Sequence, residues 1–488
     1  MDGLPLFKSS KLQLWPILGM FTEIHKSGLF QIALLSGEQK LSHLAEYLKD
    51  FIDDMKKNFV NGIKVSGQLY HIKLAAFICD SPARSFLKGV KGHEGYNACE
   101  RCIQEGDWDG KKVIFPDMDA PLRTDLGFNN MQDAAHHHIL SPLCELNVGL
   151  VSQFVLDYMH LVCLGVVRKL ICLWIGGPLK TRLPSTIINT VSQCLASVRK
   201  HIPDEFACKP CSLSEVKMWK ATEQRQFLLY TGPIALQGNI KSAMYRNFLL
   251  LSVCITVLLS PDMCLLSCDY IQDLLRTFVI NFSAIYGKKQ LTYNVHSLLH
   301  LVDDAHQYGC SDNVSCFPFE NALGKIKRMI RKPQSPVAQI CHRITELHFG
   351  MDATTVSKHH LQHYSGPNMK GCETWQQFKK FSCEKFVLSI FCGNNCLSVD
   401  GVVCNILRSP SGATFAVFSP FEKNEPFSNY PFSLCHFNLF TVSLLSTDIT
   451  LKQLDKTCSL QFASGFGSNG EVSGVSAGKV RVLPYCRG

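Results

Sequence analysis

The sequence predicts an α+β protein, and three features of its 488 residues carry that prediction. Short apolar runs near the N-terminus alternate with turn residues, which is typical of strands. The middle of the chain, residues 147–310, has apolar residues at mostly helical spacing. From residue 385 short apolar runs alternate again with Gly, Asn, Ser and Pro, so a small all-β domain is expected at the C-terminal end.

The first 80 residues predict the element order β, β, β, α, β. Residues 15–21 and 30–35 predict strands, and residues 41–59 have the apolar spacing of a helix. Residues 74–79 predict a buried strand that ends at Asp80. With Asp2 near the first strand, two aspartates then stand where a ribonuclease-H-like fold places two catalytic carboxylates.

The later elements divide the rest of the chain. Residues 81–145 are rich in Gly and Pro and predict loops. Helices are predicted over 185–201, 245–259, 320–330 and 336–358, and strands over 386–391, 402–407 and 414–418. The predicted domains are residues 1–98 (first part of the core), 99–310 (a mainly helical insertion with zinc-binding segments), 311–380 (the last core helices, carrying Glu320) and 385–488 (the C-terminal β-rich domain).

The amino-acid composition indicates the cellular compartment and the kind of binding partner. A hydrophobic content of 46% with 18% charged residues is typical of a folded protein, and the net charge of +9 suits a polyanionic partner. The chain has 23 cysteines and does not open with a signal-peptide pattern, which indicates a reducing compartment, the nucleus or otherwise the cytoplasm. The longest apolar run, 248–259, is too short to cross a membrane, so we expect no membrane partner.

A split set of cysteines and histidines predicts a structural zinc site. Cys99 and Cys102 follow a turn at 95–97, and His296 and His300 are spaced to share one face of a helix. Two thiolates and two imidazoles form the closed tetrahedral set that zinc takes. Such a site would tie the loop after Asp80 to the helix before Glu320.

Alternatives to this zinc set remain open. A single Cys-x-x-Cys pair is a weak signal at this cysteine content, and the chain has a second one, Cys208 and Cys211. The histidine pair could equally be partly buried or capping. The run 136–138, three consecutive histidines, is a rival source of ligands, although such a run in a polar loop is more typical of solvated side chains.

Asp2, Asp80 and Glu320 form the candidate catalytic set. Carboxylates are the ligands of Mg²⁺ or Mn²⁺, and a pair of such ions assists phosphodiester displacement. Each acid has a structural alternative: a frayed terminus for Asp2, a helix N-cap for Asp80 and a first-turn helix acid for Glu320. A weaker metal-ligand set is Asp157 with His160, whose alternative is an N-cap aspartate with a surface histidine.

Basic residues follow Glu320 on the predicted helix. Lys325, Lys327, Arg328 and Arg331 are suitably placed to contact DNA phosphates. The alternative is a solvated charged face.

Several short segments together resemble one family. They are residues 2–10 (DGLPLFKSS), 79–84 (CDSPAR), 92–102 (GHEGYNACERC), 156–162 (LDYMHLV), 294–300 (NVHSLLH) and 316–321 (CFPFEN). In these segments the chain resembles the transposases of CACTA (En/Spm-type) DNA transposons, in the branch found as transposase-domain proteins in animal genomes. The resemblance spans residues 1 to about 350 and, more loosely, the β-rich end.

The resemblance implies a ribonuclease-H-like core of the DDE type, interrupted by a helical insertion between the second aspartate and the glutamate. The reaction it implies is the cleavage of DNA strands and their joining by attack of a 3′-hydroxyl. The expected partner is DNA, a homo-oligomer is possible, and no small-molecule substrate is expected. The order Asp, Asp, Cys-x-x-Cys, His pair, Glu also resembles the zinc-braced core of the V(D)J recombinase. This order favours Asp80 over Asp157 as the second acid, because Asp80 ends a strand whereas Asp157 lies inside the insertion.

The first acid departs from the family pattern. In the family this aspartate lies within a strand that has residues ahead of it, whereas only Met1 precedes Asp2 here. We therefore expect Asp2 to be loosely held. Two functional expectations follow: a metal-dependent DNA strand-cleavage and transfer protein with impaired activity, or a catalytically inactive, domesticated transposase remnant that binds DNA or protein.

Overall fold

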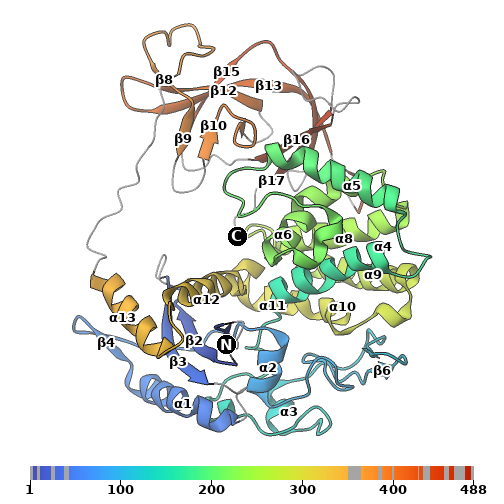
Figure 1. Cartoon of the computed structure of the whole chain (residues 1–488), viewed down its shortest axis with the longest axis vertical. Coiled ribbons are helices and arrows are strands. Elements are labelled where there is room, and N and C mark those ends of the chain that lie inside the picture. Colours follow the sequence, from blue (N-terminus) through green and yellow to red (C-terminus); the bar gives the residue numbers. More distant parts are fainter. Residues whose placement is uncertain are drawn as a thin grey trace. The chain divides into compact units, whose positions relative to one another are not determined.

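The chain contains both helices and strands, as expected for the predicted α+β class, and the described elements after residue 350 are strands (Figure 1). The structure, a computed structural model, describes residues 4–7, 11–23, 28–37, 43–349, 364–382, 387–397, 401–426, 428–431, 440–454, 461–466 and 479–484. The chain divides into two compact units, the first made of Met1–Val166 and Leu258–Thr354 and the second of Val167–Val257 and Thr355–Gly488.

The first unit holds every candidate site residue that the structure describes. Its strands are β1 (Leu4–Pro5), β2 (Gln13–Met20), β3 (Leu29–Gly37), β4 (Ile63–Val65), β5 (Gln68–Tyr70), β6 (Asp107–Trp108) and β7 (Val113–Ile114). Its helices are α1 (Leu44–Asn61), α2 (Ser81–Lys88), α3 (Asp125–Asn129), a π-helix (Met159–Val167), α9 (Cys268–Tyr286), α10 (Tyr293–Ser297), α11 (Leu301–Tyr308), α12 (Phe317–Met329) and α13 (Pro336–Phe349).

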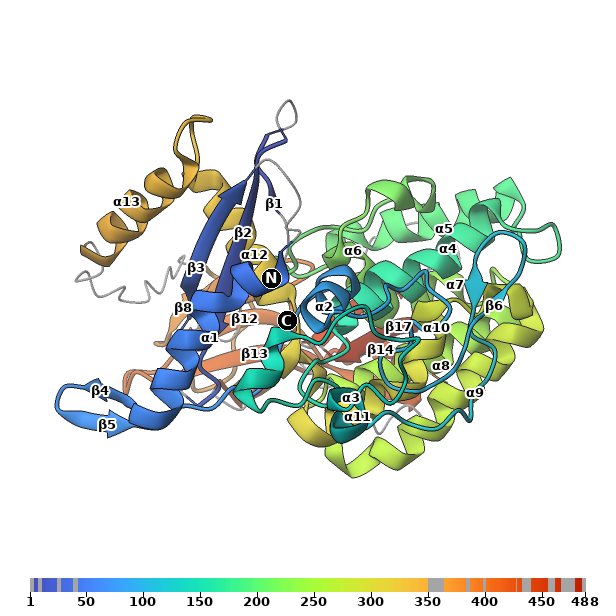
Figure 2. The ribbon, with the colours of Figure 1, turned by 90° about the horizontal axis from the view of Figure 1, so that it is seen from below.

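A small antiparallel sheet in the order β1-β2-β3 has helices on both faces. Side chains alternate along a strand, so neighbouring residues of β2 point to opposite sides. Ile17 belongs to the cluster that contains the buried face of α1, and Leu14 packs in a second cluster with Ile326 of α12 and Ile340 of α13. Figure 2 shows α1 and α12 on opposite sides of β2 and β3. This layering fixes the helix that carries Glu320.

Helix α1 forms where apolar spacing predicts a helix. Its buried side chains, Leu44, Tyr47, Leu48, Phe51 and Ile52, recur at intervals of three and four residues, which puts them on one face. The helix ends at Asn61, and the following Gly62 has φ +66°, a conformation that glycine adopts without steric cost. The prediction of a helix over 41–59 is therefore confirmed with a small shift.

The predicted buried strand over 74–79 is not a regular strand, and that prediction was wrong. The segment makes one isolated parallel bridge, in which Phe77 N donates to Gln153 O at 2.7 Å and Phe77 O accepts from Val155 N at 3.3 Å. The Gln153 side-chain amide then donates to Ala75 O at 3.2 Å, where the next ladder hydrogen bond would form, and to Leu74 O at 2.6 Å. A side chain thus takes the place of a strand partner and ends the ladder.

The second unit combines a helical part with a β-rich part. Its helices are α4 (Arg168–Gly176), α5 (Ser185–Val198), α6 (Ala221–Gln226), α7 (Gly232–Leu236) and α8 (Ser242–Leu258). Its strands are β8 (Gln376–Phe378), β9 (Lys380–Ser382), β10 (Val387–Ser389), β11 (Cys396–Leu397), β12 (Gly401–Arg408), β13 (Thr414–Pro426), β14 (Phe440–Leu445), β15 (Thr450–Gln453), β16 (Gln461–Phe466) and β17 (Lys479–Pro484).

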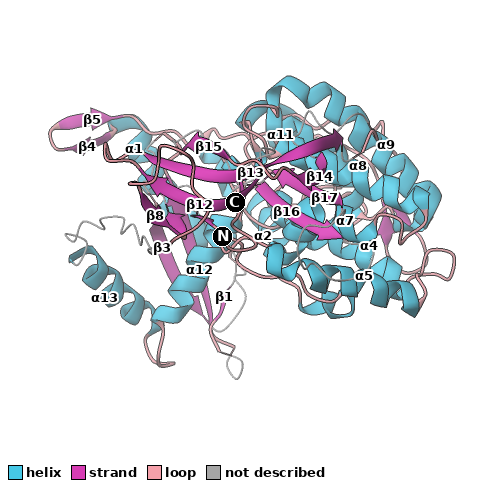
Figure 3. Ribbon diagram, turned by 90° about the horizontal axis from the view of Figure 1, so that it is seen from above, coloured by secondary structure: helices cyan, strands magenta, loops and turns pink. Residues whose placement is uncertain are grey.

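The β-rich end contains antiparallel strands paired in the order β11-β12-β13-β14-β17-β16. Figure 3 shows strands β12 to β17 of this sheet. The predicted strands 402–407 and 414–418 lie inside β12 and β13, whereas 386–391 shortens to β10. The predicted helices 185–201 and 245–259 correspond to α5 and α8, and the prediction over 336–358 runs beyond the described end of α13. The predicted insertion 99–310 is shared between the two units, and its boundaries stay predictions.

One apolar stretch, Met159–Gly176, has the length and composition of a membrane-spanning helix. Of this window 56% is buried inside the protein, and core helices of soluble proteins pass the same test, so it is weak evidence for a membrane. The expectation of no membrane partner stays a prediction.

The contact of α1 with the sheet gives a stability test. Leu48 is 0% exposed, and Leu48→Ala is expected to lower the free energy of unfolding by about 2–5 kcal/mol, because it leaves a cavity in the core. Denaturant unfolding measures the change. Val60→Ala is the matched control on the same helix, because Val60 is 80% exposed and its truncation is expected to cost less than about 0.5 kcal/mol. Equal effects of the two substitutions would contradict the packing described.

Candidate metal centre and acidic site

The predicted zinc ligands come together in the first unit. Cys99, Cys102, His296 and His300 are all buried, and one donor atom of each lies within 4.8 Å of the others. The two Sγ atoms are 3.4 Å apart, and the two Nε2 atoms are 3.4 Å apart. Sulfur-to-nitrogen distances are 3.2 Å for Cys102 to His296 and 3.7 Å for Cys99 to His300.

These separations match a tetrahedral ion. Bonds of about 2.3 Å to sulfur and about 2.0–2.1 Å to nitrogen place neighbouring ligand atoms about 3.3–3.8 Å apart. The set also has the composition of a closed structural site, with no position left for water or substrate. This buried Cys₂His₂ cluster can therefore bind a metal ion such as zinc.

Local backbone geometry presents each pair of ligands. Gly95 N donates to Gly92 O at 2.8 Å and closes the turn before the cysteines, and Cys102 N donates to Cys99 Sγ at 3.4 Å. The histidines do not share one regular α-helix as predicted, because a 3-10 turn, Leu298–His300, separates α10 from α11. The Gln104 side-chain amide lies 3.1 Å from His296 Nδ1 and holds that ring from its other nitrogen.

The two thiols differ in acidity. Burial opposes a charge on Cys99, but hydrogen bonds from Cys102 and from both imidazoles lower the pKa of the Cys99 thiol well below its usual value. The hydrogen bond to Cys99 and burial raise the pKa of Cys102. Metal binding would release the remaining proton, because the ligand form of cysteine is the thiolate.

The rival ligands have other environments. His136 and His137 are buried, so the expectation of solvated side chains was wrong for them. Both rings pack around Phe128, and burial lowers the pKa of His136 to about 4. Neither the histidine run nor Cys208 and Cys211 belongs to a ligand cluster in the part of the chain that the structure describes.

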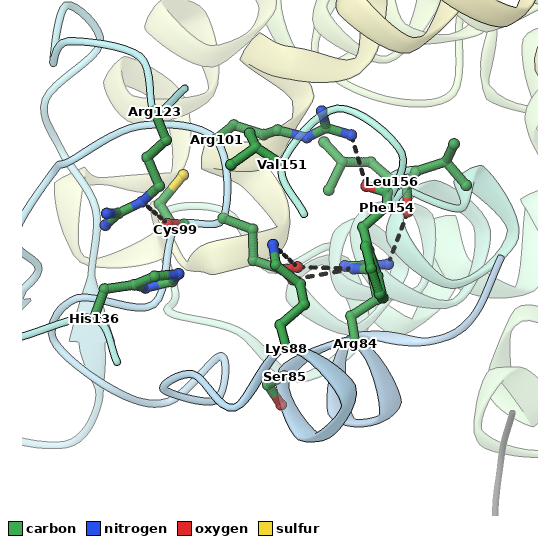
Figure 4. A network of polar contacts seen from close by, with 12 residues as sticks. Arg84, Ser85, Lys88, Cys99, Arg101, Arg123, His136, Val151, Phe154 and Leu156 are labelled. Carbon is green, nitrogen blue, oxygen red and sulfur yellow. Dashed lines mark hydrogen bonds and ion pairs between the residues drawn. The ribbon is translucent and has the colours of Figure 1, made fainter. Parts of the chain in front are cut away.

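The two residues between the metal-site cysteines are buried and charged. Glu100 accepts from Arg84 Nε at 3.0 Å, from Lys88 Nζ at 3.1 Å and from the Tyr293 hydroxyl at 2.8 Å. Figure 4 shows Arg84 and Lys88 reaching from α2, with dashed lines to their partners. Arg101 points the other way and pairs with Asp304 of α11 at 2.6 Å. The loop is therefore joined to α2, α10 and α11 by its own side chains.

The ion pairs of Glu100 with Arg84 and Lys88 determine the charge of these buried groups. Burial would raise the pKa of Glu100, but the neighbouring Arg84 and Lys88 charges lower it to about 2. Burial lowers the pKa of Lys88, whose ammonium also lies 5.2 Å from the Phe128 ring centre and 5.6 Å from the Phe154 ring centre. The carboxylate and its cations therefore stabilise one another only while all are present.

This network also fixes the two segments that lead to the acids. Arg84 Nη1 donates to Cys79 O at 3.0 Å and to Val155 O at 3.3 Å, so one guanidinium joins both bridged segments. Arg101 Nη2 donates to Phe154 O at 2.8 Å, and the Leu156 N–H donates to Asp304 Oδ2 at 2.6 Å. The first segment ends at Asp80 and the second at Asp157, each three residues after its bridged phenylalanine.

Asp80 and Asp157 have different local roles. Asp80 is the N-cap of α2, where Oδ1 accepts from Ala83 N at 2.8 Å, as its structural alternative predicted. Asp157 is 1% exposed, and its Oδ1 accepts from Cys316 N at 2.8 Å. Its Oδ2 accepts from His160 N at 3.0 Å and lies 2.7 Å from His160 Nδ1. Asp157 thus joins the start of the π-helix to the start of α12.

Glu320 lies in the first turn of α12 and faces this histidine. His160 Nε2 is 4.0 Å from Glu320 Oε1. Burial would lower the pKa of His160, but Asp157, followed by Asp80 and Glu320, raises it. Asp157, His160 and Glu320 therefore lie together, Asp80 acts on His160 only through its charge, and Asp2 lies outside the described residues.

The predicted DNA-contacting residues lie on the solvent side of α12 and its end. Leu323 and Ile326 are buried, whereas the four basic residues Lys325, Lys327, Arg328 and Arg331 are exposed. The Lys327 ammonium donates to Pro5 O and so also holds β1.

Sequence reasoning missed the residues that hold the site in place. Arg84, Glu100 and Arg101 lie within segments 79–84 and 92–102, and their proximity to the candidate ligands was the available signal. Asp304 and Cys316 carried no such signal, because their partners are distant in sequence. Searches with protein-family models and among curated proteins give no match for this chain.

The metal centre is tested by metal analysis. The purified full-length protein is expected to contain zinc, and Cys99→Ser is expected to lose about one equivalent, because three ligands do not complete a structural site. Mass spectrometry of the dialysed proteins measures the content. Cys208→Ser is the matched control from the other Cys-x-x-Cys pair and is expected to keep its metal. A wild-type protein without zinc, or an unchanged zinc content in Cys99→Ser, would contradict the assignment.

The buried carboxylate gives a pH-dependent test. Glu100→Gln is expected to lower the free energy of unfolding by about 3–5 kcal/mol near neutral pH, because it leaves two buried cations without their counter-charge. The pKa of Glu100 falls from 4.5 to about 2 on folding, so its contribution is full above pH 4.5 and is lost as pH falls toward 2. The difference between variant and wild type should therefore shrink over that range in denaturant unfolding.

Glu145→Gln is the control for this substitution. Glu145 pairs with Lys56 at the surface, where an ion pair contributes less than about 1 kcal/mol. A difference between Glu100→Gln and wild type that stays constant from pH 5 to pH 2 would refute the buried ion pair as its cause.

Proposed function

We propose that this chain is a transposase-derived protein whose first unit carries a DDE-type core for DNA strand cleavage and transfer. The observation that carries the proposal is the approach of Glu320 to His160, which Asp157 holds. Glu320 Oε1 lies 4.0 Å from His160 Nε2, and Asp157 Oδ2 lies 2.7 Å from His160 Nδ1. Two acids that are far apart in sequence thus meet at one histidine, in the unit that also holds a buried Cys₂His₂ cluster.

The surrounding architecture supports the proposal. Asp80 and Asp157 follow neighbouring parallel-bridged segments, and polar residues beyond the carboxyl ends of parallel strands are a common place for ligands. The β1-β2-β3 sheet lies between α1 and α12, as a ribonuclease-H-like core requires. Because the 74–79 segment makes only an isolated bridge, the ribonuclease-H-like fold itself is part of the proposal.

The proposed chemistry assigns each group a task. Asp80 and Glu320 would hold divalent cations with Asp2 as the third acid, and bound Mg²⁺ or Mn²⁺ would stabilise the attacking and leaving oxygens of a phosphodiester. The exposed Lys325, Arg328 and Arg331 would contact DNA phosphates C-terminal to Glu320. Zinc at the Cys₂His₂ cluster would be structural, and the protein would act in the nucleus.

A catalytically inactive, DNA- or protein-binding remnant is the second candidate, and one observation favours it. Among the described residues, no group of ligand atoms within 4.8 Å of one another contains both Asp80 and Glu320. A core that binds DNA without assembling its acids would retain the zinc cluster and the basic residues of α12.

Nicking of supercoiled plasmid in the presence of Mn²⁺ tests the proposal. Glu320→Gln and Asp80→Asn are expected to slow nicking by about 100-fold or more, because each removes a ligand of the catalytic cations. Asparagine caps helices as well as aspartate does, so Asp80→Asn keeps the α2 cap and isolates the loss of charge. Asp273→Asn, an exposed acid of α9, is the control and is expected to retain activity.

The outcomes separate the two candidates. Nicking that survives Glu320→Gln excludes this active site. DNA binding by the wild-type protein without any nicking supports the inactive remnant.

A further inference from the structure

His160 is held in one orientation by a buried carboxylate. Asp157 Oδ2 lies 2.7 Å from His160 Nδ1 and also accepts from the His160 N–H at 3.0 Å. A ring nitrogen that donates to a carboxylate fixes the tautomer, so the lone pair of a neutral imidazole then belongs to Nε2. His160 lies in the π-helix Met159–Val167, a local widening that is frequent at functional sites.

Asp157 has no remaining freedom to act as a ligand itself. It is 1% exposed, and its other oxygen accepts from the Cys316 N–H at 2.8 Å. Moving this carboxylate toward an ion would leave a buried N–H group unpaired, which costs about 1–3 kcal/mol. Cys316, whose thiol lies within 4.8 Å of the donor atoms of Asp157 and His160, is 4% exposed, and its backbone N–H is the group that Asp157 holds. The triplet Asp157, His160 and Cys316 therefore supports a ligand rather than forming a site.

The Nε2 side of the ring faces Glu320. His160 Nε2 lies 4.0 Å from Glu320 Oε1, and the His160 and Glu320 side chains are 25% and 42% exposed. Bonds of about 2.0–2.2 Å from one ion to nitrogen and to oxygen span up to about 4.3 Å, so one ion can contact both atoms. A histidine that donates one nitrogen to a carboxylate and offers the other to a cation is the usual arrangement of a metal ligand.

We propose that His160 Nε2 and the carboxylate of Glu320 form a mixed imidazole–carboxylate site for a divalent transition-metal ion. Asp157 is the positioning residue that orients the imidazole. This inference rests on the proposed function of the same site, and it adds one ligand and the class of cation. Imidazole suits transition metals, whereas Mg²⁺ prefers oxygen ligands, so the site should favour Mn²⁺ over Mg²⁺.

Binding of Mn²⁺ can be measured without DNA. The probe is Mn²⁺ alone, titrated into the full-length protein with its zinc retained, and followed by electron paramagnetic resonance of the free ion. His160→Ala is expected to weaken Mn²⁺ binding at least about 10-fold, and Glu320→Gln should weaken it similarly. His306→Ala is the matched control, because His306 Nε2 lies 3.8 Å from Asp269 Oδ1 in an exposed pair. Its affinity is expected to match that of the wild type.

A spectroscopic readout separates a direct ligand from a structural support. Electron spin-echo modulation from a coupled ¹⁴N nucleus should accompany Mn²⁺ bound to the wild type and to Glu320→Gln, and should be absent in His160→Ala. An unchanged Mn²⁺ affinity in His160→Ala, or bound Mn²⁺ without nitrogen modulation in the wild type, overturns the inference. Unchanged zinc content in each variant confirms that the fold is retained.

Failure of the inference and failure of the proposed function are distinguishable. Nicking that requires Glu320 while His160→Ala binds Mn²⁺ normally would leave the proposed function intact and exclude His160 as a ligand. Nitrogen-coupled Mn²⁺ in a protein that never nicks DNA would support the metal site and exclude strand cleavage as its function.

Discussion

The loop Cys99-Glu100-Arg101-Cys102 is the constraint on which the first unit depends. Its two thiols lie against the imidazoles of His296 and His300. Glu100 pairs with Arg84 and Lys88 of α2, and Arg101 pairs with Asp304 of α11. Each residue of the loop thus holds a different partner. The Cys₂His₂ cluster and three buried ion pairs act at one place, so they hold together segments that are far apart in sequence.

Burial explains why the charged residues of this loop need particular partners. A charge removed from water is tolerated only with a partner, and Arg84, Lys88 and Glu100 are each almost wholly buried. Removing one partner leaves the others uncompensated, so the network forms as a whole or not at all. A core of aliphatic side chains could supply comparable stability, but it would not fix where the Cys79 and Val155 carbonyls lie, as the Arg84 guanidinium does.

The acids around His160 differ in their hydrogen bonding and in their exposure to solvent. Asp157 is committed to internal hydrogen bonds and orients a ring, whereas Glu320 is half-exposed and faces that ring. Asp80 caps α2 through one oxygen. Histidines that bind metals in proteins are usually oriented in this way, by a carboxylate at the ring nitrogen that faces away from the metal. The hydrogen bonds of Arg101 and Asp304 position the segment that ends at Asp157.

The sequence by itself determined the elements whose signals are local. The spacing of apolar residues predicted α1, α5, α8, β12 and β13, and ligand types and spacing predicted the Cys₂His₂ cluster. Only the tertiary structure decided that 74–79 makes one bridge, because the competing donor is the Gln153 side chain. It also decided the burial of His136 and His137 and the partners of Glu100 and Asp157. These features depend on contacts between residues distant in sequence, which no local pattern encodes.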